Sequence, residues 1–346
     1  MIRIQNALWE IRNWFRGITN AVADFLKNHK MGFLVNWPGW LKAIVFLAPA
    51  LTLLGIFTFY PIVNAFRLVG FVGYRVIDGV EQATGYTVFG NFITVITEDN
   101  FILPSSHTQS SVLINTLIIV LISVPLSVII SLMVAVALNS IKPLRSFFQT
   151  IYFLPYVTNS IAIGLVFAYM FRSGNSGLVN RMLSVFGVDP ITWIERGATF
   201  WKAMFVLLIY GTWGALAFKI MVFMTSIQGI DKQYYQAAAI DNTSKWRIFS
   251  KITVPLISPM IFYIVITSVI GAFKTYETVI AIFGNTGAPA GATYTLKTIV
   301  FYIYDYLNVS APGNLSLAAA SSIVLFAFIL VLTLIQMQVG KKRIHY

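Results

Sequence analysis

The stretch S-V-L-I-N-T-L-I-I-V-L-I-S-V-P-L-S-V-I-I-S-L-M-V-A-V-A-L-N, residues 111–139, contains no Asp, Glu, Lys or Arg. A helix needs about 20 mostly apolar residues to cross the hydrocarbon core of a bilayer, and this stretch is longer. Its apolar residues run continuously and do not alternate with polar ones, which excludes a strand of a membrane barrel. Because lipid offers the backbone no hydrogen-bond partners, the stretch is predicted to be a transmembrane helix.

The composition of the whole chain agrees with a membrane protein. Of its 346 residues, 58% are hydrophobic and 10% are charged, whereas a soluble domain carries about 25% charged residues. The mean hydropathy of +0.78 is too high for a surface that faces water, which excludes a soluble enzyme and a disordered protein. The absence of cysteine excludes disulfide bonds and thiolate metal sites.

Five further apolar stretches are long enough to cross a membrane, and one of them is interrupted by Lys219. After trimming by polarity, the six predicted spans cover about residues 43–66, 111–139, 147–171, 203–228, 257–283 and 315–338. We therefore expect an all-α membrane protein with six transmembrane helices, whose transmembrane domain extends over residues 43–338.

The distribution of basic residues predicts the orientation of these spans. Of the 24 lysines and arginines, 15 lie in segments on the side of the N-terminus, 7 lie in the opposite loops, and Lys219 and Lys274 lie inside spans. Cytoplasmic loops carry the excess of basic residues. We therefore expect both termini on the cytoplasmic side of the cell (inner or plasma) membrane, together with the segments 1–42, 140–146, 229–256 and 339–346.

The basic segment 1–42 precedes the first span, and residues 339–346 form a short basic tail. Apolar side chains recur every three or four residues in the N-terminal segment: Ile4, Leu8, Ile11, Phe15, Ile18, Val22 and Phe25. This spacing predicts an N-terminal amphipathic helix, which either lies on the inner membrane face or packs on the transmembrane bundle.

The sequence lacks the motifs that would give this chain catalytic chemistry. It contains no phosphate-binding loop of the Walker type, no H-E-x-x-H motif and no G-x-S-x-G motif. Its three histidines, His29, His107 and His345, are far apart. We therefore expect no catalytic residue, no metal and no cofactor bound by this chain. The net charge of +12 is explained by basic residues in the cytoplasmic loops, so it does not indicate that the chain binds nucleic acid.

Few charged residues fall inside the predicted spans, and the ones to explain are Lys219, Lys274 and Glu277. A carrier coupled to protons or sodium usually needs buried acids in its core helices, and Glu277 is the sole clear example. If the chain moves a solute uphill, the energy is therefore expected to come from a partner.

The loop between the fourth and fifth spans contains Y-Y-Q-A-A-A-I-D-N-T-S-K-W-R-I-F-S-K-I-T-V-P-L-I-S-P, residues 234–259. Its alanines favour a helix and leave room for another chain to approach. Asp241 and Asn242 are predicted to end that helix, since Asn tolerates the left-handed conformation that turns often need. Trp246, Phe249 and Ile252 lie at helical spacing and predict a second amphipathic helix. The loop is either an ordinary connector or a docking element, and its length and apolar content favour docking.

This loop resembles the coupling loop of binding-protein-dependent ABC importer permeases, whose pattern is E-A-A, three residues, G, nine residues and I-x-L-P. The spacing is the same here, and the matching positions are Gln236, Ala237, Ala238, Asn242, Ile252, Val254 and Pro255. Three of these positions depart from the family pattern, with Gln for Glu, Asn for Gly and Val for Leu. Gln236 keeps a hydrogen-bonding carbonyl but loses the charge, and a charge-assisted hydrogen bond is about twice as strong as a neutral one.

The resemblance to the sugar-importing class of these permeases covers residues 43–338. Similar positions occur in the same order in five segments: Phe46, Pro49, Phe57, Tyr60 and Pro61; Asn115 and Thr116; Phe171, Gly174, Gly177, Leu178 and Asn180; Phe273, Lys274, Tyr276, Glu277, Pro289, Ala292, Thr293, Thr295 and Leu296; and Tyr302, Ile303 and Tyr304. The chain therefore resembles a maltose-type carbohydrate permease, which implies the fold of a type I ABC importer.

The resemblance also implies a function and a set of partners. It implies a permease subunit that moves a sugar or oligosaccharide into the cell by alternating access. The partners would be a second homologous permease subunit, two cytoplasmic ATPase subunits that hold ATP and Mg, and an extracellular or periplasmic solute-binding protein. The loop 229–256 would couple this chain to one ATPase, and its coupling residues would be Gln236, Ala237, Ala238, Asp241, Asn242, Ile252 and Pro255.

Aromatic and polar residues of spans four and five are predicted to line the path of the solute. They are Tyr210, Trp213, Gly214, Phe273, Lys274, Tyr276 and Glu277. The alternative is that these rings pack in the bundle or face lipid, since 15% of the chain is aromatic. Lys274 and Glu277 are three residues apart, so on one helix they would either form a structural ion pair or contact the solute.

Three other functions compete with a sugar permease. A permease for another solute, such as an amino acid, phosphate or a metal chelate, is disfavoured by the segment from Phe273 to Leu296. A secondary carrier would need internal repeats and buried coupling acids, and an intramembrane enzyme would need a catalytic constellation; the sequence contains none of these.

The orientation leads to a labelling prediction. We predict that Ser106→Cys reacts with a membrane-impermeant thiol reagent on intact cells, whereas Ser244→Cys reacts only after the cells are permeabilised. The absence of native cysteine removes background labelling. Labelling of Ser244→Cys in sealed cells would contradict the predicted orientation.

Overall fold

The computed structural model describes residues 38–77, 79–97, 101–102, 104, 110–141, 145–307 and 314–341. The chain forms two compact units, residues 1–64 and residues 65–346. Three predicted features lie outside the described residues: positions 1–37 of the N-terminal segment, the labelling position Ser106, and positions 342–346 of the tail.

Four helices among the described residues have the length and apolar character of a membrane span: Ala43–Val69, Val112–Ser140, Phe200–Gln228 and Leu315–Gly340. They coincide with the first, second, fourth and sixth predicted spans, so these stretches form helices as predicted, and their passage through a membrane stays a prediction. The helical segments Lys245–Leu256 and Ser258–Phe273 meet at a bend of 70°. If the two count as one span, the described residues contain five candidate spans. The total of six stays a prediction.

The first unit contains helix α2, Gly39–Leu54, which continues through the π-helical turn η2, Gly55–Phe59, into α3, Tyr60–Val69. Pro49 lies inside α2 and does not end it. The boundary between the two units falls within α3, after Asn64.

The second unit is built mainly from helices. In chain order they are α4 Gly90–Thr97, α5 Val112–Ser140, α6 Arg145–Val157, α7 Ser160–Met170, η3 Gly174–Ser176, α8 Leu178–Ser184, α9 Phe200–Gly214, α10 Leu216–Gln228, α11 Lys232–Ile240, α12 Lys245–Ile248, η4 Phe249–Thr253, α13 Val254–Leu256, α14 Ser258–Phe273, α15 Glu277–Phe283, η5 Gly284–Thr286, α16 Ile299–Leu307 and α17 Leu315–Lys341. The described residues also form two antiparallel strand pairs: β1 Phe71–Val72 with β4 Gly85–Tyr86, and β2 Arg75–Ile77 with β3 Val80–Gln82.

The prediction of one continuous helix over residues 147–171 is wrong. Helix α6 ends at Val157 and α7 begins at Ser160. The side-chain oxygen of Asn159 accepts hydrogen bonds from the backbone N–H groups of Ile161 (2.9 Å) and Ala162 (3.1 Å). Asn159 therefore caps α7, and a cap of this kind starts a new helix inside an apolar run.

The predicted span 257–283 is also interrupted, because α14 ends at Phe273 and α15 begins at Glu277. Lys274 and Glu277 consequently do not share a helix, and the ion pairs found among the described residues do not join them. The carboxylate of Glu277 accepts a hydrogen bond from the Ser160 hydroxyl instead. The expected pairing of Lys274 with Glu277 is therefore wrong.

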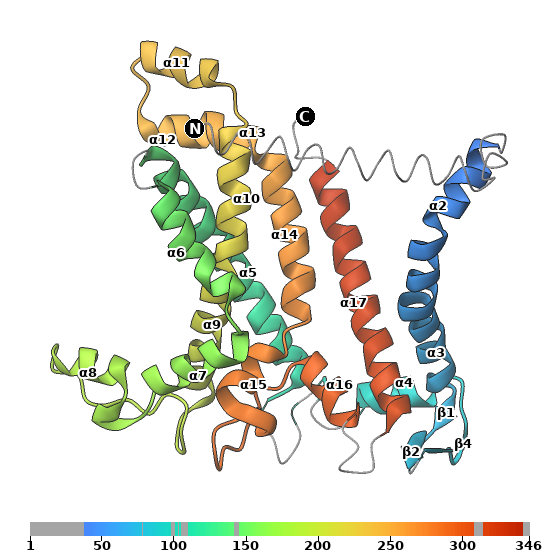
Figure 1. The fold of residues 1–346 in the computed structure, drawn as a ribbon. Coiled ribbons are helices and arrows are strands. Elements are labelled where there is room, and N and C mark those ends of the chain that lie inside the picture. Colours follow the sequence, from blue (N-terminus) through green and yellow to red (C-terminus); the bar gives the residue numbers. More distant parts are fainter. Residues whose placement is uncertain are drawn as a thin grey trace, which may run out of the picture. The chain divides into compact units, whose positions relative to one another are not determined.

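Helix α5 lies at the centre of the second unit. It packs against α9, α10, α14 and α16, and α17 packs against α14 and α16. The main apolar core combines side chains from these helices, including Val124, Phe223, Ile264 and Phe273. Figure 1 shows α5, α10, α14 and α17 running alongside one another, with α11 and α12 at one end of these helices and α8, α15 and α16 at the other.

The segment before α5 forms a small lobe at the end of the unit where α17 begins. The Asn91 side-chain amide donates hydrogen bonds to the carbonyl groups of Val69 (2.7 Å) and Phe71 (2.6 Å). The Leu315 N–H donates to the Tyr74 carbonyl over 2.9 Å. These bonds tie the strands and α4 to the first turn of α17.

Helices α7 and α15 approach each other closely at Gly164. A Cβ at this position would lie 2.2 Å from the Cβ of Ala281, whereas a Cβ at Gly271 would meet no atom within 4 Å. The contact therefore requires glycine at position 164.

We predict that Gly164→Val destabilises the protein by about 1–3 kcal/mol through overpacking. A melting temperature several degrees lower should be seen in thermal unfolding followed by tryptophan fluorescence. Gly271→Ala is the control and should leave the melting temperature unchanged or slightly raised. Equal melting temperatures for Gly164→Val and the wild type would show that α7 and α15 do not pack in this way.

Candidate functional site

The loop that follows α10 is folded into a compact element, here called the knob, residues 231–253. The Asp231 carboxylate accepts a hydrogen bond from the Gln233 N–H (2.9 Å) and caps α11. At the other end of α11, the N–H groups of Asn242 and Thr243 donate to the carbonyls of Ala239 (3.2 Å) and Ala238 (2.9 Å). This pattern is a Schellman motif, which places its turn residue in the left-handed conformation.

Asn242 is that turn residue. Its φ of +50° is the one positive φ found at a non-glycine position among the described residues. Asn tolerates this conformation better than other side chains do. The prediction that Asp241 and Asn242 end the helix is therefore confirmed.

The knob has an inner and an outer face. Ala238 is 5% exposed, and the hydroxyl groups of Tyr235 and Thr253 lie 3.1 Å apart in a hydrogen bond that joins α11 to η4. The room left by Ala238 therefore serves packing within this chain and not the approach of a partner. Ile252 and Pro255 are half-buried behind it.

The outer face carries the other predicted coupling residues. Gln236, Ala237 and Asp241 are exposed. Two large apolar side chains lie beside them in the knob, with Ile240 86% exposed and Trp246 73% exposed. The described part of this chain leaves both side chains uncovered, so they are available to contact another protein.

A cavity of about 370 Å³, here called the main cavity, lies among α5, α6, α9, α10, α14 and α15. Its wall combines small residues and hydroxyl groups with two aromatic rings; it includes Ser123, Tyr156, Gly211, Gly214, Phe218, Lys219, Thr267, Ser268, Gly271, Thr275 and Thr278. The rings of Tyr156 and Phe218 are nearly parallel, with centroids 6.1 Å apart. Such a mixture suits a ligand that presents both hydroxyl groups and apolar faces.

A smaller cavity of about 190 Å³ adjoins the main cavity and shares Gly211, Gly214 and Thr278 with it. Its other lining residues are Ser160, Ile163, Tyr210 and Trp213. The Tyr210 hydroxyl donates to the Ser160 carbonyl, and the Ser160 hydroxyl donates to the Glu277 carboxylate. Ser160 therefore connects the two predicted residues at the break between α6 and α7.

The ring of Phe167 orients the aromatic wall of the smaller cavity. Its centroid lies 5.0 Å from that of Tyr210 and 5.4 Å from that of Trp213. Contacts of this kind hold aromatic side chains in one orientation.

The structure thus brings together Tyr210, Trp213, Gly214 and Glu277, and it places the three other predicted path residues elsewhere. Phe273 is completely buried in the main core. Tyr276 packs against Phe301 and Tyr304, with centroid distances of 5.3 Å and 4.8 Å. Lys274 is exposed at the end of α14 and does not line either cavity.

A seam of polar residues lies between α5 and α9–α10. The sequence analysis singled out Lys219 but did not select Thr212 or the serines of α5. The Lys219 ammonium donates to the Ser127 hydroxyl, the Thr212 hydroxyl donates to the Ser123 hydroxyl (3.5 Å), and the Ser131 hydroxyl donates to the Leu216 carbonyl (3.4 Å). The three serines recur every four residues in an apolar helix, and this spacing was the signal available in the sequence.

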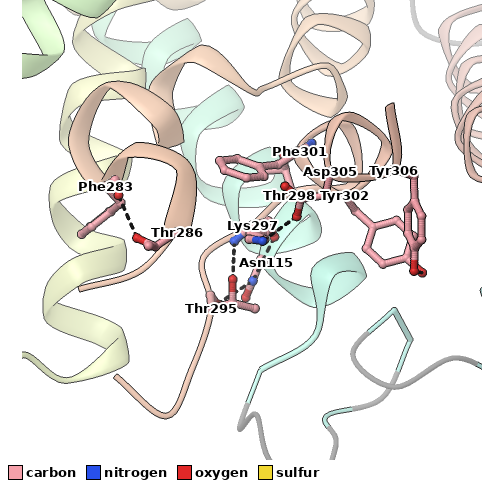
Figure 2. Close-up of polar contacts among 10 residues, drawn as sticks. All are labelled: Asn115, Phe283, Thr286, Thr295, Lys297, Thr298, Phe301, Tyr302, Asp305 and Tyr306. Atoms are coloured by element: carbon pink, nitrogen blue, oxygen red, sulfur yellow. Dashed lines mark hydrogen bonds and ion pairs between the residues drawn. The ribbon is translucent and has the colours of Figure 1, made fainter. Parts of the chain in front are cut away.

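The segment that follows α15 contains Thr295 and Lys297 and is part of the resemblance to the sugar permeases. Hydrogen bonds hold it against the first turns of α5 (Figure 2). The Asn115 side-chain amide donates to the carbonyls of Thr295 (2.8 Å) and Lys297 (3.1 Å). The Ile299 N–H donates to the Thr116 hydroxyl (3.1 Å). Lys297 forms an ion pair with Asp305 over 2.5 Å. Asn115 and Thr116 therefore hold α16 against α5 and act as structural residues.

A second asparagine of the resemblance has a similar role in the segment between α7 and α9. The Asn180 side chain donates to the carbonyls of Arg172 (3.2 Å) and Ile191 (2.8 Å), and it accepts from the indole N–H of Trp193 (3.0 Å). At Gly177 a Cβ would lie 2.0 Å from the Arg172 carbonyl oxygen, so glycine is required there.

Known transport proteins are similar to this chain in sequence. The chain is 30% identical over 308 residues to the lactose transport system permease protein LacF of Rhizobium radiobacter, covering 88% of this chain and 94% of LacF. It is 28% identical to the arabinooligosaccharides transport system permease protein AraP of Bacillus subtilis, covering 86% of this chain and 87% of AraP. It is 26% identical to the sn-glycerol-3-phosphate transport system permease protein UgpA of Brucella suis, covering 90% and 99%.

The fold is also similar to a solved membrane transporter. A chain of the bacterial alginate ABC transporter, crystallised in complex with its alginate pentasaccharide-bound periplasmic protein, superposes with a TM-score of 0.70 at 22% identity, covering 92% of this chain and 97% of that chain. The sequence profile described as "Binding-protein-dependent transport system inner membrane component" matches residues 105–345. The chain therefore belongs to the family of inner membrane components of binding-protein-dependent transport systems.

Proposed function

We propose that this chain is the permease subunit of an ATP-driven importer that moves a sugar or oligosaccharide into the cell by alternating access. It works with a second homologous permease subunit, two cytoplasmic ATPase subunits and an extracellular or periplasmic solute-binding protein. ATP and Mg are bound by the ATPase subunits. Both termini of the chain lie on the cytoplasmic side of the inner or plasma membrane.

The observation that carries this proposal is the geometry of the knob. A capped helix is held on η4 by Ala238 and by the Tyr235–Thr253 hydrogen bond, and it exposes Ile240 and Trp246. A compact element that is continuous with α10 and leads into α14 transmits a displacement to both helices. Closure of an ATPase dimer around the knob would then move the transmembrane helices as rigid bodies.

The class of solute is supported by two observations. Two of the relatives named above transport lactose and arabinooligosaccharides. The main cavity combines hydroxyl groups with the rings of Tyr156 and Phe218, which are the groups that bind the polar edges and apolar faces of a sugar.

A non-sugar solute is the second candidate, because the relative from Brucella suis is a permease for sn-glycerol-3-phosphate. Uptake of labelled sugars compared with labelled glycerol phosphate by cells that express the whole importer decides between the two. A secondary carrier is not retained, since the family to which the chain belongs consists of components of binding-protein-dependent systems.

The docking role of the knob is tested by a charge on its outer face. We predict that Ile240→Lys weakens binding of the ATPase by at least about 30-fold, because an anchoring side chain at a docking surface contributes about 2 kcal/mol or more. A lysine is compatible with the last turn of a helix, so the knob itself should stay folded. The measurement is the amount of ATPase that co-purifies with each permease.

The matched control is Phe186→Lys, which changes a side chain that is 83% exposed two residues after α8. Helix α8 lies at the opposite end of the unit from α11 (Figure 1). It should leave ATPase binding unchanged.

Gln236→Glu should be tolerated or should slightly strengthen assembly, since it restores the charge of the family pattern. Full ATPase binding and full uptake by Ile240→Lys would disprove the coupling role.

The solute path is tested at Trp213. We predict that Trp213→Ala lowers the apparent affinity for sugar in uptake about fivefold, since the ring forms a wall of the smaller cavity and an aromatic contact contributes about 1 kcal/mol beyond burial. Assembly with the ATPase should survive. Trp201→Ala, on the same helix and 63% exposed, should transport normally. Unchanged uptake kinetics of Trp213→Ala would exclude this residue from the path.

A further inference from the structure

Lys219 is a charged residue deep inside a membrane-length helix. It lies nine residues before the end of α10 at Gln228, which corresponds to about 13 Å along the helix axis. The residue is 6% exposed, so its ammonium does not extend to the end of the helix. Placing a cation at this depth is costly, and such residues usually face a cavity or a partner.

The described residues offer Lys219 a hydroxyl group and no counter-ion. Its ammonium donates to the Ser127 hydroxyl, and the three ion pairs found in the described part of the chain involve other residues. Ser127 is neutral and satisfies one of the three N–H groups that a lysine carries. Lys219 therefore keeps donor capacity that no group in the described part of the chain uses.

Lys219 lies beside a space that could hold a negatively charged ligand. Lys219 is one of the residues that line the main cavity of about 370 Å³, and none of the lining residues is acidic. Hydroxyl groups of Ser268, Thr275 and Thr278 line the same wall. Lys219 is the one basic residue of a wall that also contains hydroxyl-bearing side chains and two aromatic rings, a composition that is complementary to a sugar with an anionic group.

We propose that the main cavity binds the carboxylate or phosphate group of an acidic carbohydrate as it crosses the membrane, with the Lys219 ammonium as its counter-ion. Ser127 positions the ammonium, and the hydroxyl groups of the wall bind the uncharged part of the solute. An ammonium pairs with either anion as a point charge. This inference rests on the proposed function and specifies its solute as an anionic sugar.

The test uses the complete importer, this chain with its partner permease and ATPase subunits, in lipid nanodiscs. Equilibrium binding is measured for three radiolabelled probes: digalacturonate, glucose 6-phosphate and lactose. We expect at least one acidic probe to bind at least tenfold more tightly than lactose. Preference for digalacturonate identifies a carboxylate ligand, and preference for glucose 6-phosphate identifies a phosphate ligand.

The contribution of Lys219 is measured with Lys219→Met, which keeps the length of the side chain and removes the charge. The affinity for the acidic probe should fall at least tenfold, and the affinity for lactose should change less than twofold. Lys219→Arg should restore the preference. Lys202→Met is the matched control, because Lys202 is exposed on α9 and lies outside the cavity wall.

Several results would overturn the proposal. Equal affinity for all three probes, no binding of either acidic probe, or an unchanged preference in Lys219→Met would each do so. A purely structural role would lower the melting temperature of Lys219→Met and of Ser127→Ala alike, with no selective loss for the acidic probe, and would also overturn it. Failure of the ATPase to co-purify with the wild-type chain would instead count against the proposed function.

Discussion

The pairing of α5 with α9–α10 is the contact on which the rest of the second unit depends. Lipid supplies no hydrogen-bond partners, so polar groups inside a membrane bundle must bond to one another or to the backbone. The serines of α5 recur every four residues and meet this need against one neighbouring helix pair, with Ser127 accepting from Lys219 at the centre. Because α5 also packs against α14 and α16, the seam positions the helices that form the cavity wall.

The cavities lie where helices are interrupted. Helix α7 begins anew at the cap of Asn159, α9 gives way to α10 at Ala215, and α15 begins at Glu277 after a break from α14. An interrupted helix leaves backbone and side-chain polar groups that are satisfied only within the protein or by a bound solute. At the first break, Ser160 joins Tyr210 to Glu277, so the same interruption that shortens the helix builds the polar edge of the smaller cavity.

The knob combines two properties that mechanical coupling requires. Its inner face is closed by Ala238 and by the Tyr235–Thr253 hydrogen bond, which makes it stiff. Its outer face leaves Ile240 and Trp246 uncovered. Asn242 fits this geometry, because the Schellman motif is complete with asparagine in the left-handed conformation.

The sequence by itself determined the class of protein, four of the spans, the helical turn at Asn242 and the aromatic residues Tyr210 and Trp213 near the cavities. These follow from local properties, namely hydropathy over about 20 residues and the φ preference of single residues. Tertiary structure decided that Phe273 enters the core, that Glu277 bonds to Ser160 and not to Lys274, and that Lys219 faces the main cavity. Each of these depends on which distant helix lies opposite a given face, and hydropathy along one helix does not contain that information.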